Sequence, residues 1–149
     1  MITYVNGDIF RSNADVIVHG CNCFCTMGAG IARQVARYYP QAYTADKKTP
    51  CGSKAKLGTY SSWTGQHYFK PERTVTIVNA YTQWKYGGKT RNFSYSALKD
   101  VLPKIKNDFA GKTIALPKIG AGLGGGDWKI IEQIINMVFN DKDVLVYEY

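Results

Sequence analysis

Short apolar runs recur along the chain, and turn residues bound most of them. Runs rich in Val and Ile are typical of strands, and runs without polar positions are typical of strands buried on both faces. The predicted strands cover residues 2–5, 16–18, 59–63, 74–81, 113–116 and 144–147. Residues 59–63 differ from the others because their apolar and polar side chains alternate, which is typical of a half-buried strand.

Several stretches between the strands repeat their apolar positions at helical spacing, which predicts helices. They cover residues 30–39, 92–107 and 128–139. Pro40 marks the end of the first helix, and Pro103 is expected to kink or end part of the second. The polar residues 41–56 are predicted to form a short helix followed by a loop.

Strands that alternate with helices predict an α/β fold. We expect a three-layer α/β/α sandwich with one mixed central sheet. The chain of 149 residues is long enough to bury a core, so we expect residues 1–149 to form a single domain. In such sheets ligands bind beyond the strand ends, where the loops diverge.

The stretch between the strand at 16–18 and the helix at 30–39 predicts an anion-binding loop. A polar, cysteine-rich turn at residues 19–25 is followed by small residues that open the helix. Backbone N–H groups at a helix start are unpaired, and the helix dipole adds partial positive charge there. Small side chains let a ligand approach this backbone closely. The small-residue loop consists of Gly28, Ala29, Gly30 and Ile31.

A second glycine-rich loop follows the strand at residues 113–116. Its residues are Gly120, Ala121, Gly122, Leu123 and Gly124. Two such loops in one small domain predict a ligand that carries more than one phosphate. The alternative is that these glycines only permit tight packing.

The formal net charge is +8, which favours association with polyanions such as nucleotides, nucleic acids or acidic protein tails. The alternative is a solvated basic surface. The basic clusters are Lys47, Lys48, Lys54 and Lys56, and Lys85, Lys89 and Arg91. No stretch is apolar enough to span a membrane and no signal peptide precedes the first strand, so we expect a cytoplasmic protein without a membrane partner.

The four cysteines do not have the spacing of a zinc site. Cys21, Cys23 and Cys25 alternate with other residues, and Cys51 stands apart, whereas zinc ligands usually occur in paired sets. We therefore expect free, reduced thiols in a cytoplasmic protein, with no metal and no cofactor.

Short motifs in a specific order resemble the macro domain, an ADP-ribose-binding module. Each motif alone is non-specific, but their order is informative, and the resemblance covers the whole chain. The motifs are Asn6-Gly7-Asp8-Ile9, the turn ending in Asn22, Met27-Gly28-Ala29-Gly30-Ile31-Ala32 and Pro117-Lys118-Ile119-Gly120-Ala121-Gly122-Leu123.

This resemblance implies roles for individual residues. Asp8, with Ile9 beside it, matches the acid that accepts a hydrogen bond from the adenine amino group, and Asn22 matches the asparagine beside the distal ribose. The two glycine-rich loops match those that hold the diphosphate. An alternative for Asp8 is that its carboxylate only caps a turn.

Two branches of the family resemble this chain most. Residues 19–23, 28–32 and 37–40 resemble the fungal-type ADP-ribose 1″-phosphate phosphatases. Residues 122–128 resemble the branch that contains the terminal ADP-ribose protein glycohydrolases and the antitoxins that remove ADP-ribose from DNA. Those glycohydrolases use a lysine where this chain has Gln83, and an amide cannot form a Schiff base with an opened ribose. Lys85 could substitute only if the loop were shifted.

The leading hypothesis is therefore metal-independent hydrolysis of the terminal phosphate of ADP-ribose 1″-phosphate by a monomer. His19 would protonate the leaving oxygen or orient water, Asn22 would lie beside the ribose, and Asp127 would orient or activate water. The alternatives are a satisfied core histidine for His19 and a helix N-cap for Asp127. Trp128, Tyr81 and Phe24 are candidates for stacking on adenine or ribose, with Tyr81 and Trp128 preferred, although core packing explains any one of them more often than not.

Two other functions remain open at the level of the sequence. A non-catalytic ADP-ribose reader needs the same loops but no acid or base. A de-ADP-ribosylating glycohydrolase would act on ADP-ribosylated protein or nucleic acid and would use the basic residues 85–91 as a contact surface.

Overall fold

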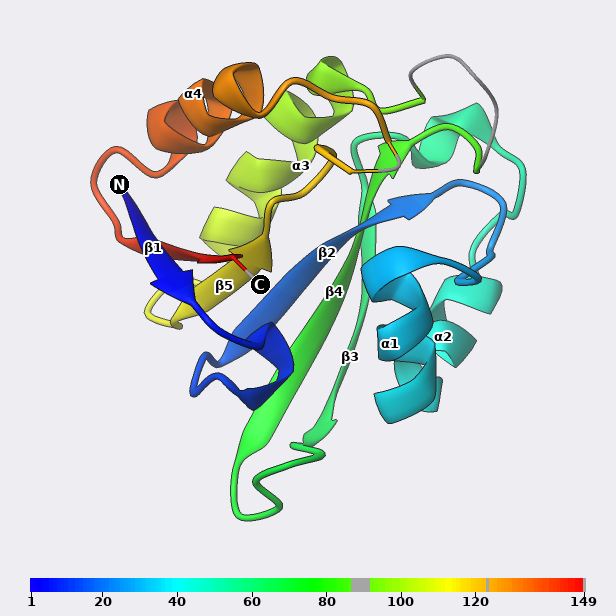
Figure 1. The fold of residues 1–149 in the computed structure, drawn as a ribbon. Helices are drawn as coiled ribbons and strands as arrows, with labels where there is room; N and C mark the ends of the chain where they lie inside the picture. Colours follow the sequence, from blue (N-terminus) through cyan, green and yellow to red (C-terminus); the bar gives the residue numbers. More distant parts are fainter. Residues whose placement is uncertain (87–91, 123, 149) are drawn as a thin grey trace.

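A computed structural model describes residues 1–86, 92–122 and 124–148 and shows a mixed sheet between two layers of helices (Figure 1). The strands are β1 Ile2–Asn6, β2 Val16–Asn22, β3 Tyr60–Gln66, β4 Thr74–Gln83, β5 Ile114–Pro117 and β6 Val144–Glu148. The helices are α1 Gly30–Tyr38, α2 Pro40–Lys47, α3 Tyr95–Asp108 and α4 Trp128–Val138, with short 3₁₀ helices at Ile9–Arg11 and Lys54–Lys56. The predicted fold class is confirmed.

The sheet has the strand order β1-β6-β5-β2-β4-β3. Among the described strands, β3 pairs antiparallel with β4, and every other neighbouring pair is parallel. Parallel strands end at the same edge of a sheet. The loops that follow β2, β4 and β5 therefore meet at one edge, which is where the site lies.

Alternating side chains divide the core between the two faces of the sheet. Val16 and Val18 of β2 pack beneath α3 and α4, whereas Ile17 packs on the side of α1 and α2. This alternation follows from the pleat of a strand. Within the described part of the chain, no helix combines the length and apolar character needed to cross a membrane.

Strand β2 is longer than the sequence pattern predicts. Residues 19–22 were expected to form a turn, but they continue the strand and pair with β4 from His19↔Asn79 to Asn22↔Gln83. The polar side chains of this segment find hydrogen-bond partners within the fold, so they do not break the strand. Among the helices, Pro103 lies inside α3, which continues to Asp108.

The expectation of reduced thiols is wrong for half of the cysteines. Cys25 and Cys51 form a disulfide with Cα atoms 5.5 Å apart, whereas Cys21 and Cys23 are buried free thiols. Sequence spacing could not reveal this pair, because helices α1 and α2 intervene and return the chain to the loop after β2. The bond joins that loop to the segment after α2.

We expect Cys51→Ser to lower the free energy of unfolding of the oxidised protein by about 3 kcal/mol, because the disulfide no longer restricts the unfolded chain. Urea unfolding of both proteins, with and without dithiothreitol, measures this difference. The reductant should destabilise the wild type to the level of the variant and leave the variant unchanged. Equal stability of the wild type in both buffers, after thiol titration has shown a disulfide, would contradict the prediction.

Candidate functional site

The loops after β2 and β5 enclose a pocket of about 590 Å³ at the carboxyl edge of the sheet. A volume of this size suits a small-molecule ligand. The wall is formed by the end of β2, the start of α1, the end of β4 and the residues that follow β5. The pocket thus brings together both glycine-rich loops that the sequence singled out, apart from Ala121, which is not among the lining residues, and Leu123, which lies outside the described residues.

The start of α1 faces this pocket without a side-chain cap. Its N-cap residue is Ala29, which makes no side-chain cap hydrogen bond. In contrast, Ser94 and Asp127 cap α3 and α4 through their side chains. The pocket is lined by Ala29, Gly30 and Ile31, so the uncapped first turn and the positive end of its dipole are available to an anion.

The second loop is built on the ring of Phe93. Gly120 has φ 78°, and a Cβ placed there would lie 2.4 Å from Cε1 of Phe93. The Phe93 backbone N–H donates to the Gly124 carbonyl at 3.2 Å, and Gly126 N–H donates to the Gly120 carbonyl at 2.7 Å. The sequence assigned Phe93 only to a helix face, so its role beneath this loop was missed.

Asn22 lines the pocket and fixes the shape of the loop that follows β2. Its Nδ2 donates to the carbonyl and to Oγ1 of Thr26 at 3.1 and 2.8 Å, and its Oδ1 accepts from the Phe24 backbone N–H at 2.8 Å. Thr26 also lines the pocket, and the sequence analysis did not single it out. The role of Asn22 beside a ribose stays a prediction.

The structure places His19 in the core and not among the residues that line the pocket, and its expected catalytic role stays a prediction. Its side chain is fully buried, and its Nε2 lies 2.7 Å from Oδ1 of Asn79. Because Oδ1 can only accept, the ring nitrogen donates. Burial lowers the pKa of His19 to about 4, so the ring is neutral at neutral pH. His19 is a satisfied core histidine.

The two predicted aspartates serve as caps in the structure. Asp127 is exposed, accepts from the Lys129 backbone N–H at 3.0 Å and is absent from the pocket lining, so its expected role in activating water stays a prediction. Asp8 accepts from the Phe10 N–H at 3.0 Å and lies 3.8 Å from Arg11. Asp8 and the buried Ile9 are also not among the lining residues, and their contact with adenine stays a prediction.

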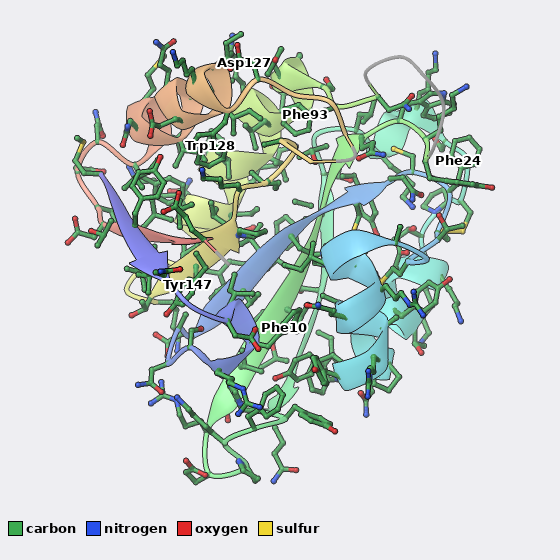
Figure 2. All side chains as sticks on the ribbon, viewed as in Figure 1. Phe10, Phe24, Phe93, Asp127, Trp128 and Tyr147 are labelled. Atoms are coloured by element: carbon green, nitrogen blue, oxygen red, sulfur yellow. A yellow bond between two sulfur atoms is a disulfide. The ribbon has the colours of Figure 1, made fainter. Side chains whose placement is uncertain are left out.

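None of the three aromatic residues proposed for stacking is among the residues that line the pocket. Tyr81 is 1% exposed, and its hydroxyl donates to Asp46 at 2.7 Å. Trp128 is the first residue of α4, away from Phe24 (Figure 2), and its Nε1 donates to the Tyr4 hydroxyl at 3.0 Å. Tyr81 is buried and Trp128 is half-buried against the core, and stacking of these rings on a ligand stays a prediction.

A buried ion pair supports the loop after β2 from below. Lys56, which the sequence placed in a surface cluster, is 4% exposed, and its Nζ lies 3.8 Å from the Asp46 carboxylate. The same ammonium donates to the Cys23 carbonyl at 3.4 Å and lies 4.1 Å from the centre of the Tyr81 ring. Desolvation raises the pKa of Asp46 despite these contacts. The charge pattern of the sequence did not predict that Lys56 and Asp46 are buried.

The described lining residues include no carboxylate and no imidazole. Lys118 is the cation among them, and its Nζ lies 2.9 Å from Glu148. Gln83 also lines the pocket, and its Nε2 donates to the Lys85 carbonyl at 2.7 Å. Tyr86, which the sequence analysis did not identify, borders the opening, and the rest of the predicted basic loop, residues 87–91, lies outside the described residues. The site is therefore rich in anion-binding groups rather than in acids or bases.

Comparison with known proteins gives a consistent relationship. A family model described as Macro domain matches residues 18–135. An uncharacterised 17.5 kDa protein of Enterobacteria phage T4 is 36% identical, with 100% of this chain and 97% of that protein covered. An ADP-ribose 1″-phosphate phosphatase of Debaryomyces hansenii is 27% identical over 99% of this chain and 98% of its own length.

A DNA ADP-ribosyl glycohydrolase of Mycobacterium tuberculosis is 31% identical over 99% of this chain, which spans 42% of that protein's length. The solved macrodomain of Mycobacterium tuberculosis DarG superposes with a TM-score of 0.77 at 30% identity, covering 100% of this chain and 98% of the other. These likenesses extend over the whole pocket and both of its glycine-rich loops.

We expect Gly120→Ala to lower the free energy of unfolding by about 1–3 kcal/mol, because the new methyl group meets the Phe93 ring and the positive φ is unfavourable. Gly122→Ala is the matched control, since a Cβ there meets nothing within 4 Å. It should change stability by less than about 0.5 kcal/mol. Urea unfolding measures both, and equal effects would contradict the proposed support by Phe93.

His19 makes the stability of the protein depend on pH. Its pKa is about 4 in the folded protein and 6.5 when unperturbed, so between these values the unfolded chain binds the extra proton. The free energy of unfolding should therefore fall by about 3 kcal/mol as the pH decreases across this interval. His19→Gln should lose this part of the decrease in urea titrations. His67 contributes equally to both proteins, so it does not affect the comparison. If the free energy of unfolding has the same slope against pH in both proteins, the pH dependence does not come from His19.

Proposed function

This chain belongs to the macro domain family, and we propose that it binds ADP-ribose between its two glycine-rich loops and hydrolyses an ADP-ribose derivative. Two relatives of different activity support this ligand. One is named for ADP-ribose 1″-phosphate and the other for ADP-ribosyl groups on DNA, so the ADP-ribosyl group is common to both.

The observation that carries the proposal is the uncapped start of α1, which shares one pocket with the loop containing Gly120 and Gly122. A diphosphate is the anion that two such loops suit, because each can donate backbone N–H groups to one phosphate. Lys118 adds a positive charge to the same wall. These contacts would fix the ligand and leave its distal end near Asn22.

For the reaction, we favour release of phosphate from ADP-ribose 1″-phosphate. Water attacks phosphorus and loses a proton, the bond from phosphorus to the ribose oxygen breaks, and a proton passes to that ribose oxygen, which leaves as a hydroxyl. Phosphoryl transfer needs mainly positioning and stabilisation of negative charge, which backbone amides and Lys118 can supply without a carboxylate in the described lining. The amide of Gln83 agrees with this choice, since it cannot replace a Schiff-base lysine.

A second candidate is removal of ADP-ribose from nucleic acid. The supporting observation is the 31% identity with the mycobacterial DNA ADP-ribosyl glycohydrolase across nearly the whole chain. In this reaction water would displace the nucleic acid from the distal ribose carbon of its ADP-ribosyl group, and a proton would pass to the departing atom of the nucleic acid. A reader without turnover is the third candidate, and the lack of acids and bases in the described lining supports it.

We expect Gly28→Glu to weaken ADP-ribose binding by at least about tenfold, because its carboxylate would repel the diphosphate at the start of α1. Isothermal titration calorimetry measures the affinity. Gly28→Ala is the control, because a Cβ at this position meets nothing within 4 Å, and its affinity should stay close to that of the wild type. Gly28→Gln separates charge from bulk. Undiminished binding by Gly28→Glu would exclude this location.

A substrate panel decides between the three activities. The intact protein, with and without EDTA, is incubated with ADP-ribose 1″-phosphate and with ADP-ribosylated oligonucleotide and protein. Phosphate release in both buffers supports the favoured reaction, release of ADP-ribose supports the glycohydrolase, and binding without either product supports the reader. The favoured reaction is excluded if phosphate is not released while ADP-ribose still binds.

A further inference from the structure

An aromatic and basic surface lies on the outer side of the loop after β2, beside the pocket opening. We call it the Phe24–Trp84 surface, and it consists of Phe24, Lys54, Trp84, Lys85 and Tyr86. Phe24 is 36% exposed and Tyr86 is 61% exposed. Figure 2 shows Phe24 on the outer side of the molecule, away from the side chains that cover α4. Large exposed aromatic side chains that gather in this way are typical of a contact surface.

The two central rings are held in a defined arrangement. Phe24 and Trp84 meet edge to face, with ring centres 4.8 Å apart and planes at 61°. Trp84 is half-buried. The Lys54 ammonium lies over the Trp84 ring, 5.0 Å from its centre, so a positive charge is part of the aromatic pair.

The backbone beneath these rings is well supported. Cys23 N–H donates to the Trp84 carbonyl at 3.1 Å, and Gly52 N–H donates to the Cys23 carbonyl at 2.6 Å. The Cys25–Cys51 disulfide closes the same loop on the other side of Phe24. Because these bonds hold the backbone on both sides of Phe24, little conformational entropy of this loop is lost when a partner binds.

This surface is continuous with the pocket. Asn22 and Tyr86 both line the pocket, and the Phe24 backbone N–H donates to Oδ1 of Asn22 at 2.8 Å. A chain that lies across Phe24 and Trp84 would therefore pass the end of the pocket where Asn22 stands. The formal net charge of +8 favours a polyanion as that chain.

We propose that the Phe24–Trp84 surface binds single-stranded nucleic acid. Unpaired bases stack on Phe24 and Trp84, and Lys54 and Lys85 bind the phosphates between them. Stacking on aromatic side chains beside cations is the general mode of single-strand binding, whereas a duplex keeps its base faces covered and an acidic peptide gains nothing from the rings. The proposal stands on this surface and does not require turnover in the pocket.

Fluorescence anisotropy with a labelled oligothymidylate of about 12 nucleotides tests the proposal at low salt. We expect binding that weakens as salt is added, and a loss of at least about fivefold in affinity for Phe24→Ala and for Lys54→Glu. Trp84→Phe should retain most of the affinity that Trp84→Ala loses. Thermal unfolding shows whether each variant is folded.

Two matched controls come from other parts of the surface. Tyr68→Ala removes an aromatic side chain that is 55% exposed at the opposite end of the sheet, and Lys129→Glu reverses an exposed charge on α4. The Lys129→Glu variant should lose much less affinity than Lys54→Glu, and Tyr68→Ala should bind as the wild type does. The proposal is overturned if the oligonucleotide does not bind, if the controls lose as much as the test variants, or if a duplex or a polyglutamate peptide binds equally well. Titration of the Phe24→Ala variant with ADP-ribose measures whether the pocket still binds its ligand. A loss of oligonucleotide binding can then be distinguished from a loss of ADP-ribose binding.

Discussion

The parallel pairing of β2 with both β4 and β5 is the constraint on which the site depends. It makes three strands end at one edge of the sheet, so that the loops after β2 and β5, far apart in sequence, form the walls of one pocket. The pocket is lined by residues of both loops, so neither loop forms it by itself. The sheet supplies the geometry, and the uncapped start of α1 supplies much of the electrostatic attraction.

The binding part of the site and its supporting interior have different chemistry. The pocket presents backbone amides, small side chains and Lys118, whereas the titratable side chains of His19 and Asp46 lie in the buried layer beneath it. That layer is a continuous polar network. Asn79 joins His19 to Ser61, and Ser61 contacts the Tyr81 hydroxyl at 2.7 Å. Such a network fixes the position of the loop rather than performing chemistry.

Local patterns in the sequence predicted most of the fold. Apolar runs and helical periodicity identified the strands and helices, and small residues at Gly28–Gly30 and Gly120–Gly124 identified both loops, because these signals act within a few residues. What failed depends on distant contacts. The burial of His19 and Lys56, and the pairing of Cys25 with Cys51, result from packing between segments that are far apart along the chain. Asp127 shows a second cause, since its local role as the N-cap of α4 already accounts for its position.

The first and last strands of the described chain lie side by side. β1 pairs with β6 in parallel from Ile2↔Val144 to Asn6↔Glu148, and the Met1 amino group donates to the Phe139 carbonyl. During synthesis, β1 leaves the ribosome long before its partner exists, so this edge of the sheet can close only after residues 144–148 have emerged. Until then the apolar face beneath α4 lacks its outer strands. While the chain is still bound to the ribosome, this apolar face is therefore a surface that a chaperone can cover.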